Sequence, residues 1–173
     1  MTDTAKPFYL FTDASFEAST AAGIGAMVLL SDLDEKNLAV ETSAFEAPTI
    51  AQLEIKTALW GMSEYRRLFF SPGVTKLLLF TDCATIEKLP GRRKRLEAVN
   101  FVSKRKGTEL PNAALYRDFF AACDELSPTI FWTKGHTVAR DRNRVETIFS
   151  AVDHAAREGL REMRNGKKEI SWR

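Results

Sequence analysis

The stretch Leu10-Phe11-Thr12-Asp13 recurs, residue for residue, as Leu79-Phe80-Thr81-Asp82. Each copy closes a short apolar run that is typical of a buried β-strand. We therefore expect Asp13 and Asp82 to lie where two strands of one sheet end. Two carboxylates at neighbouring strand ends repel each other unless a cation lies between them, and a divalent metal ion is the usual cation. The repeated stretch thus predicts a metal-dependent site.

The rest of the chain divides into strands and helices around these two runs. Short links between the first three strands predict an antiparallel meander, and later strand–helix units predict parallel strands. The predicted strands are residues 8–12, 22–30, 38–45, 74–81 and 130–133. The predicted helices are residues 49–69, a short helix that ends at Leu89, residues 112–126, and a last helix with an apolar stripe formed by Val145, Ile148, Phe149, Val152 and Ala156. This pattern predicts an α/β fold, with a five-stranded mixed sheet and helices on both faces.

A third carboxylate, Glu54, lies early in the first predicted helix. Its helical neighbours Ala58 and Gly61 are small, so this side of the helix can approach the sheet closely. An acid on an inward side needs a partner, because an unpaired buried charge is costly. We therefore group Glu54 with Asp13 and Asp82, against the alternative of an exposed Glu on an ordinary amphipathic helix.

Two further candidates follow the fifth predicted strand. His136 comes after Lys134 and Gly135 at the strand's end, and Asp153 lies in the last helix within Asp-His-Ala-Ala-Arg. Glu146 lies seven residues before Asp153, two helical turns away on the same side, and is the rival for a fourth carboxylate.

A basic block lies between Gly91 and Gly107. It contains seven cations against Glu97 alone, in a chain whose net charge is only +2, so the remainder of the chain is acidic. Such a concentration of positive charge predicts a docking place for a polyanion, the alternative being a solvated loop. The basic residues are Arg92, Arg93, Lys94, Arg95, Lys104, Arg105 and Lys106.

The order of the acidic residues and the histidine resembles the ribonuclease H family, specifically the type 1 ribonuclease H-like fold, over residues 7–160. The matching residues are Asp13 in Thr-Asp-Ala-Ser, Glu54 in Gln-Leu-Glu-Ile, Asp82 in Phe-Thr-Asp-Cys, His136 in Lys-Gly-His, and Asp153. The resemblance implies catalysis by these five residues, with the four acids holding two Mg²⁺ ions, or Mn²⁺. Asp13 would bridge both ions, Glu54 and Asp82 would complete the water-activating site, and His136 would move a proton or help product leave.

By the same resemblance, the expected reaction is hydrolysis of the RNA strand of RNA/DNA hybrids, leaving 5′-phosphate and 3′-hydroxyl ends. The basic block stands where many family members carry a protrusion that grips the hybrid. Three features depart from the family: a longer gap between His136 and Asp153, Ile50 and Ala51 where amides often read the minor groove, and Ala84 where an amide is common. Alternatives are another nuclease of this fold acting on structured DNA or RNA, and a non-catalytic nucleic-acid-binding module.

Length and composition indicate the number of domains and the cellular location of the protein. At 173 residues with 45% apolar residues, the chain is expected to form a single domain over residues 1–173, with a basic tail at residues 165–173. The first residues are polar and no apolar run approaches the roughly 20 residues of a membrane span, so we expect a cytoplasmic, monomeric protein that does not bind membranes. Cys83 and Cys123 are expected to be reduced thiols, and Trp60 and Trp132 are expected in the core.

Overall fold

The computed structural model describes residues 5–133, 143–166 and 172–173, and contains a five-stranded sheet in the order β3-β2-β1-β4-β5. The strands are β1 (Lys6–Glu17), β2 (Ala22–Leu30), β3 (Glu41–Glu46), β4 (Thr75–Thr81) and β5 (Thr129–Trp132). β1, β2 and β3 pair antiparallel, whereas β1, β4 and β5 pair parallel. The helices are α1 (Ile50–Leu68), α2 (Ala84–Ala98), α3 (Ala113–Leu126) and α4 (Arg144–Arg164). The predicted mixed sheet is confirmed.

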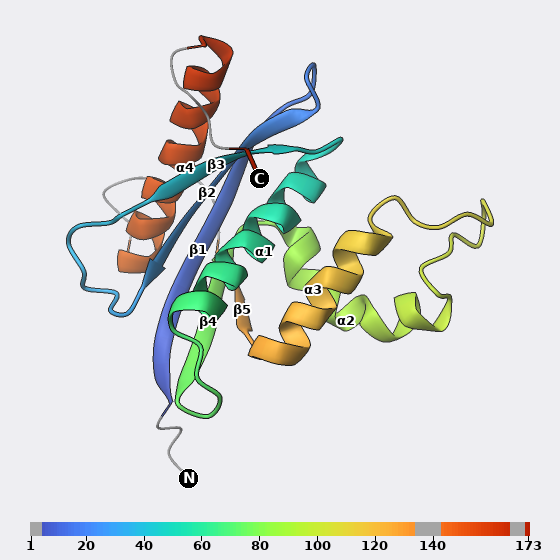
Figure 1. Cartoon of the computed structure of the whole chain (residues 1–173), viewed down its shortest axis with the longest axis horizontal. Helices are drawn as coiled ribbons and strands as arrows, with labels where there is room; N and C mark the ends of the chain where they lie inside the picture. The colour runs from blue at the N-terminus through green and yellow to red at the C-terminus, as the bar shows by residue number, and fades with distance from the viewer. Residues whose placement is uncertain (1–4, 134–142, 167–171) are drawn as a thin grey trace.

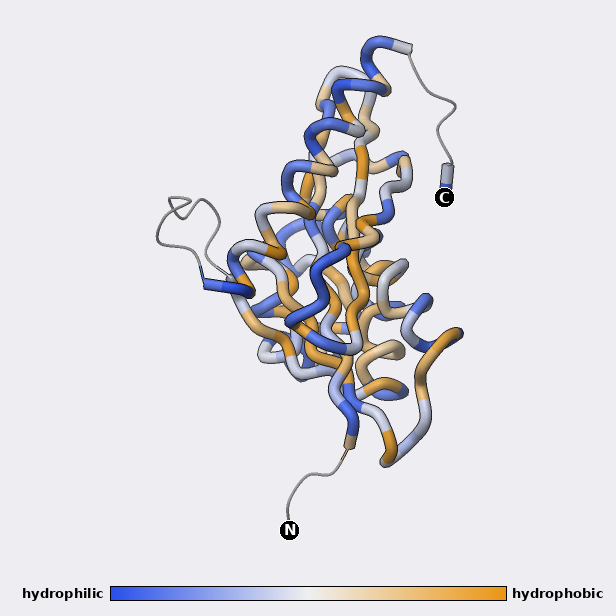
Figure 2. The backbone as a smooth tube through the Cα atoms, turned by 90° about the vertical axis from the view of Figure 1, so that its left-hand side faces the viewer, coloured by the Kyte–Doolittle hydropathy of each residue, from blue (hydrophilic) through white to orange (hydrophobic). Residues whose placement is uncertain are grey.

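The helices cover both faces of the sheet, as the sequence predicts (Figure 1). Side chains of α1, α2 and α3 join one core cluster with the sheet, and side chains of α4 form a second cluster on the other face. Hydrophobic strands lie at the centre, between the helices (Figure 2). Within the described residues, no helix combines the length and the apolar character that crossing a bilayer requires.

Helix α1 begins as the sequence predicts and packs tightly on β1. The Thr49 hydroxyl accepts a hydrogen bond from the backbone N–H of Gln52, which caps the helix N-terminus. Ala58 is fully buried, and a Cβ atom placed on Gly61 would lie 2.7 Å from a methyl carbon of Leu10. The small residues therefore let α1 approach the sheet closely, as predicted.

The predicted end of the second helix at Leu89 is wrong, because α2 continues through Pro90 to Ala98. A proline inside a helix removes one hydrogen bond and costs about 3 kcal/mol. Buried side chains on both sides of Pro90, Leu89 and Leu96 among them, pack into the core and offset this cost. As a result, Arg92, Arg93, Lys94 and Arg95 lie on a helix rather than in a loop.

The end of β1 and the burial of Trp132 also differ from the prediction. Asp13 does not end β1, because β1 stays paired with β2 as far as Glu17. Trp132 does not lie in the core: it is 54% exposed, because β5 is the last strand in the sheet order of the described residues. Trp60, by contrast, is buried as expected.

Candidate metal centre and nucleic-acid interface

The sheet brings Asp13 and Asp82 together although β1 extends further than the sequence suggests. The parallel pairing of β1 with β4 ends at Phe11 opposite Phe80, so each Asp lies two residues beyond the last pair. On its other side Asp13 pairs with Ala26 of β2. The equal spacing from a shared pair places the two carboxylates side by side, as the repeated stretch predicts.

Glu54 completes a cluster of three carboxylates. One carboxylate oxygen each from Asp13, Glu54 and Asp82 can be chosen so that all lie within 4.8 Å of one another. Asp13 is 7% exposed, and Glu54 and Asp82 are half-buried. Hard, anionic oxygen ligands at this spacing are the donors that Mg²⁺ and Mn²⁺ prefer, so the three side chains fit a divalent cation.

Burial and mutual repulsion strongly perturb the cluster. Burial, followed by the charges of Asp82 and Glu54, raises the pKa of Asp13 from 3.8 to about 8, although the backbone N–H of Ala14 donates a hydrogen bond of 2.8 Å to its carboxylate. Burial and then the charge of Asp82 raise the pKa of Glu54 from 4.5 to about 8. Groups with such shifts near neutral pH are common at functional sites.

Cys83 belongs to the surroundings of this cluster, a role that the sequence does not reveal. Its thiol donates a hydrogen bond to Glu54, and burial followed by the Glu54 charge raises the pKa of Cys83 to about 11. The thiol therefore stays protonated at neutral pH and serves as a donor rather than as a nucleophile.

Asp153 and Glu146, the two rivals for the fourth carboxylate, have different surroundings. Glu146 accepts a hydrogen bond of 2.9 Å from the backbone N–H of Asn143 and completes a capping box at the start of α4. Asp153 forms an ion pair of 2.9 Å with Arg157, and its charge contributes to the raised pKa of Asp13. The charge of Asp153 thus acts on a residue of the cluster, which favours Asp153 as the fourth carboxylate. His136 lies outside the described residues.

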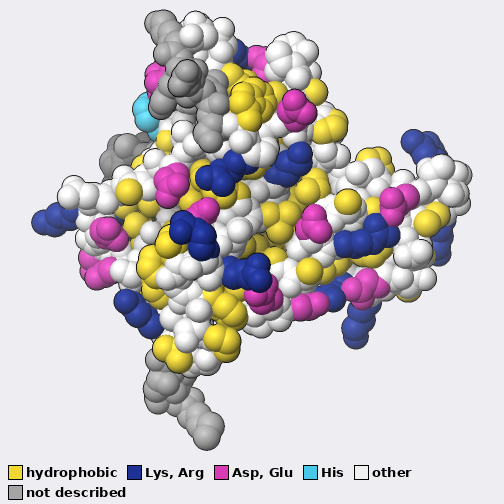
Figure 3. All heavy atoms as spheres, viewed as in Figure 1, with side chains coloured by type: hydrophobic (Ala, Val, Ile, Leu, Met, Phe, Trp, Pro, Cys, Tyr) yellow, Lys and Arg dark blue, Asp and Glu magenta, His cyan; other side chains and the backbone are white. Residues whose placement is uncertain are grey.

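The basic block divides into paired and exposed cations. Arg93 contacts Glu97 at 2.7 Å and Asp124 of α3 at 2.5 Å, so it ties α2 to α3. Five other side chains of the block are exposed: Lys94, Arg95, Lys104, Arg105 and Lys106. Figure 3 shows cationic side chains over the α2–α3 region at the right of the view, with acidic ones among them.

A groove of about 560 Å³ joins the start of α1 to α2, which carries Arg92. At its wall the Gln52 amide donates to Asn112 at 2.6 Å, and the Asn112 amide donates to the Tyr116 hydroxyl at 3.3 Å. The Arg92 guanidinium lies 5.8 Å from the centre of the Tyr116 ring. Of these groove residues the sequence singled out Arg92, as part of the basic block, but not its place beside Gln52, Asn112 and Tyr116, because these residues lie far apart along the chain.

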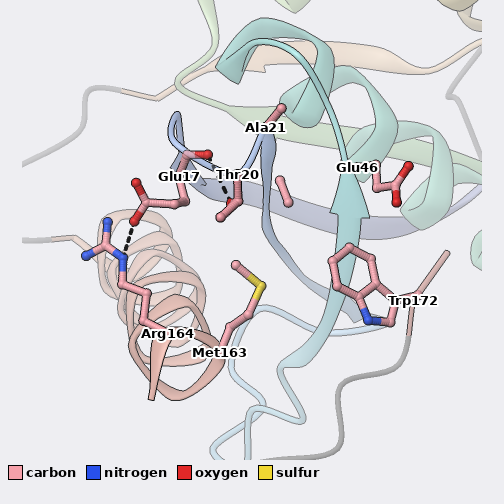
Figure 4. A pocket seen from close by; sticks show the side chains of 8 residues that line it. Glu17, Thr20, Ala21, Glu46, Met163, Arg164 and Trp172 are labelled. Carbon is pink, nitrogen blue, oxygen red and sulfur yellow. Dashed lines mark hydrogen bonds and ion pairs between the residues drawn. The ribbon is translucent and has the colours of Figure 1, made fainter. Parts of the chain in front are cut away.

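A separate cavity of about 550 Å³ lies at the C-terminal end of β1, beside Glu17 and the turn into β2 (Figure 4). An ion pair between Glu17 and Arg164 crosses one side, and Met163 and Trp172 line it as well. None of the predicted site residues that the structure describes lines this cavity, so the acidic cluster remains the candidate site.

No protein-family model matches the chain, and no curated protein sequence matches it. Solved structures do resemble it. The PFV RNase H domain superimposes with a TM-score of 0.65 at 15% identity, covering 90% of this chain and 93% of that domain. RNase H1 from Halobacterium salinarum superimposes with a TM-score of 0.58 at 15% identity, covering 90% of this chain and 98% of that one. A foamy viral protease–reverse transcriptase in complex with an RNA/DNA hybrid superimposes with a TM-score of 0.61 at 12% identity. The match covers 91% of this chain and 20% of that one.

This chain has the ribonuclease H-like fold. The predicted resemblance is therefore confirmed for the architecture: sheet order, strand directions and the helices on both faces. Within this fold, the repeated Asp residues and Glu54 come together at one end of the β1–β4 pairing.

Proposed function

We propose that this chain is a metal-dependent endonuclease that hydrolyses the RNA strand of RNA/DNA hybrids. The observation that carries the proposal is the cluster of Asp13, Glu54 and Asp82, within 4.8 Å of one another on a ribonuclease H-like fold. The foamy viral protease–reverse transcriptase, part of which superimposes on this chain, is bound to an RNA/DNA hybrid, which supports the choice of substrate.

Four carboxylates have a role in this proposal. Two divalent ions, when bound, supply an activated water and neutralise charge at the phosphorus and at the leaving oxygen. Asp13, the most buried of the three clustered acids, lies against both Glu54 and Asp82 and would hold divalent cations together with them. Asp153, whose charge reaches Asp13 from α4, is the candidate fourth ligand. His136 is proposed from the resemblance alone, for proton transfer or product release.

The hybrid would lie along the surface from the acidic cluster to the basic helix. The groove lined by Gln52, Asn112 and Arg92 would lie on this path, and the exposed cations of the block would extend it. Selectivity for RNA would come from contacts with 2′-hydroxyl groups, and much of the affinity would come from the phosphates.

Cleavage of end-labelled RNA/DNA, RNA/RNA and DNA/DNA duplexes in Mg²⁺ and Mn²⁺ tests the proposal. We expect metal-dependent cutting of the RNA strand in the hybrid, with 5′-phosphate and 3′-hydroxyl ends. Preferred cutting of the DNA/DNA or RNA/RNA duplex would instead support another nuclease of this fold. Binding of the hybrid without cutting any duplex would leave a non-catalytic binding module.

The basic block gives a prediction about binding. Replacing Lys94, Arg95, Lys104, Arg105 and Lys106 by Ala should weaken hybrid binding and reduce its salt dependence, because each lost phosphate contact lowers the slope of log K against log [salt] by roughly 0.7–0.9. Arg93 is left in place because it ties α2 to α3. Fluorescence anisotropy in Ca²⁺ at several salt concentrations measures both quantities.

The matched control for this experiment is Lys36→Ala, at an exposed cation in the link between β2 and β3. Its affinity and salt slope should equal those of the wild type. An unchanged slope in the five-residue variant would mean that the block is a solvated surface.

A further inference from the structure

Trp132 lies against the acidic cluster and contributes little to the core. It is the last residue of β5, opposite Thr81 of β4, and its side chain is 54% exposed. The indole Nε1–H donates a hydrogen bond of 3.2 Å to the backbone carbonyl of Asp82. One of the chain's largest side chains is thus bonded to the main chain of a cluster residue.

Asp82 needs such support because it lies between two regular elements. β4 ends at Thr81 and α2 begins at Ala84, so only Asp82 and Cys83 link them. The pairing of β4 with β1 has already ended at Phe80. The N–H of Cys83 donates to the Thr81 hydroxyl at 3.1 Å, and the indole holds the Asp82 carbonyl.

Repulsion within the cluster acts on this link. Carboxylate oxygens of Asp13, Glu54 and Asp82 lie within 4.8 Å of one another, so the ionised acids repel each other when no cation lies between them. Asp13 is held in a strand and Glu54 in a helix, each with a continuous hydrogen-bond ladder. The two-residue link between β4 and α2 can change its backbone conformation more easily than a strand or a helix. A small rotation of the Asp82 peptide would move the Asp82 carboxylate away from Asp13 and Glu54.

We propose that Trp132 is a positioning residue for the metal centre: its indole N–H fixes the Asp82 peptide and keeps the Asp82 carboxylate within reach of Asp13 and Glu54. The inference deepens the proposed function, on which it rests. Partners beyond the ligands of a metal site commonly affect metal affinity in this way, by orienting the ligand.

The test compares Trp132→Phe, which keeps an aromatic ring but loses the donor, with Trp132→Ala, which loses both. The control is Trp172→Phe, at a tryptophan that is 55% exposed and bridges to Ala44 of β3, away from the cluster. Mn²⁺ binding is followed without substrate, by calorimetry and by the rise in melting temperature, and hybrid cleavage is titrated with Mg²⁺ in parallel.

Both Trp132 variants should need roughly three- to tenfold more metal for half-saturation, the range that corresponds to one lost neutral hydrogen bond. Saturating metal should restore most cleavage, and Trp172→Phe should match the wild type. Melting in EDTA checks that each variant folds.

Two results would overturn the inference. Equal metal affinity in the wild type and Trp132→Phe would show that the donor has no role. Weaker hybrid binding in Trp132→Ala alone, with metal affinity unchanged, would make the ring a stacking surface for bases. Because metal binding is read without substrate, a wild type that binds metal but cuts no duplex would defeat the proposed function and leave this test valid.

Discussion

Replacing Asp13 by Asn should abolish cleavage and, in the absence of metal, stabilise the fold at alkaline pH. Asp13 is 7% exposed and lies against two other carboxylates. The amide cannot bridge cations as a carboxylate does, so we expect cleavage to fall on the order of 10³-fold or more, as when a group that acts in the reaction is removed. Quantitative cleavage of a labelled hybrid in Mg²⁺ measures the loss.

The expected gain in stability has an electrostatic reason. Above pH 8 the Asp13 carboxyl ionises although it is buried, whereas a neutral amide carries no charge into the same place. Each kcal/mol of relief corresponds to a rise of roughly 2–4 °C in the melting temperature of a domain of this size. Thermal melting in EDTA at pH 9 tests this, and a lower melting temperature for Asp13→Asn would contradict it.

Glu146→Gln and Asp153→Asn are the matched comparison on α4. Glu146 completes the capping box, so its replacement should cost at most about 0.5–2 kcal/mol of stability and leave cleavage intact. Asp153→Asn should reduce cleavage because the Asp153 charge acts on Asp13. Reduced cleavage by Glu146→Gln, with normal cleavage by Asp153→Asn, would instead assign the fourth ligand to Glu146.

The sequence predicted the sheet and the three-acid cluster because local patterns carry that information. The apolar runs before Asp13 and Asp82 have equal length, so once the two strands pair in parallel the acids must be neighbours. The small residues Ala58 and Gly61 signalled the inward side of α1 that carries Glu54. In both cases the residues that carry the pattern lie within a few positions of the site residue along the chain.

The features that the sequence did not predict depend on contacts between distant elements. Pro90 ends a helix by local rules, but the core packing of Leu89 and Leu96 sustains α2 through it. The apolar character of Trp132 suggests burial, but its place on the edge strand leaves it exposed with its N–H on Asp82. No local pattern encodes which strand lies at the edge.

The metal-free protein should lose stability as the pH rises through about 8, and divalent metal should reverse this loss. The pKa values of Asp13 and Glu54 are raised in the fold from 3.8 and 4.5 to about 8, so between about pH 4 and 8 the folded state holds protons that the unfolded state has released. Stability is therefore fully present below pH 4 for these two groups and falls until the folded carboxyls have ionised.

Bound Mg²⁺ or Mn²⁺ replaces those protons, so binding near pH 7 should release protons and become tighter as the pH rises. At ten times its Kd the metal adds about 1.4 kcal/mol of stability, or roughly 3–6 °C in melting temperature. Melting curves from pH 5 to 9 with EDTA or Mg²⁺ measure the first effect, and calorimetry in two buffers of different ionisation enthalpy counts the protons released. Glu54→Gln should flatten the pH dependence, whereas Glu87→Gln, at an exposed acid on α2, should not. A wild-type melting temperature that responds neither to pH nor to metal would mean that the three carboxylates do not form a metal centre.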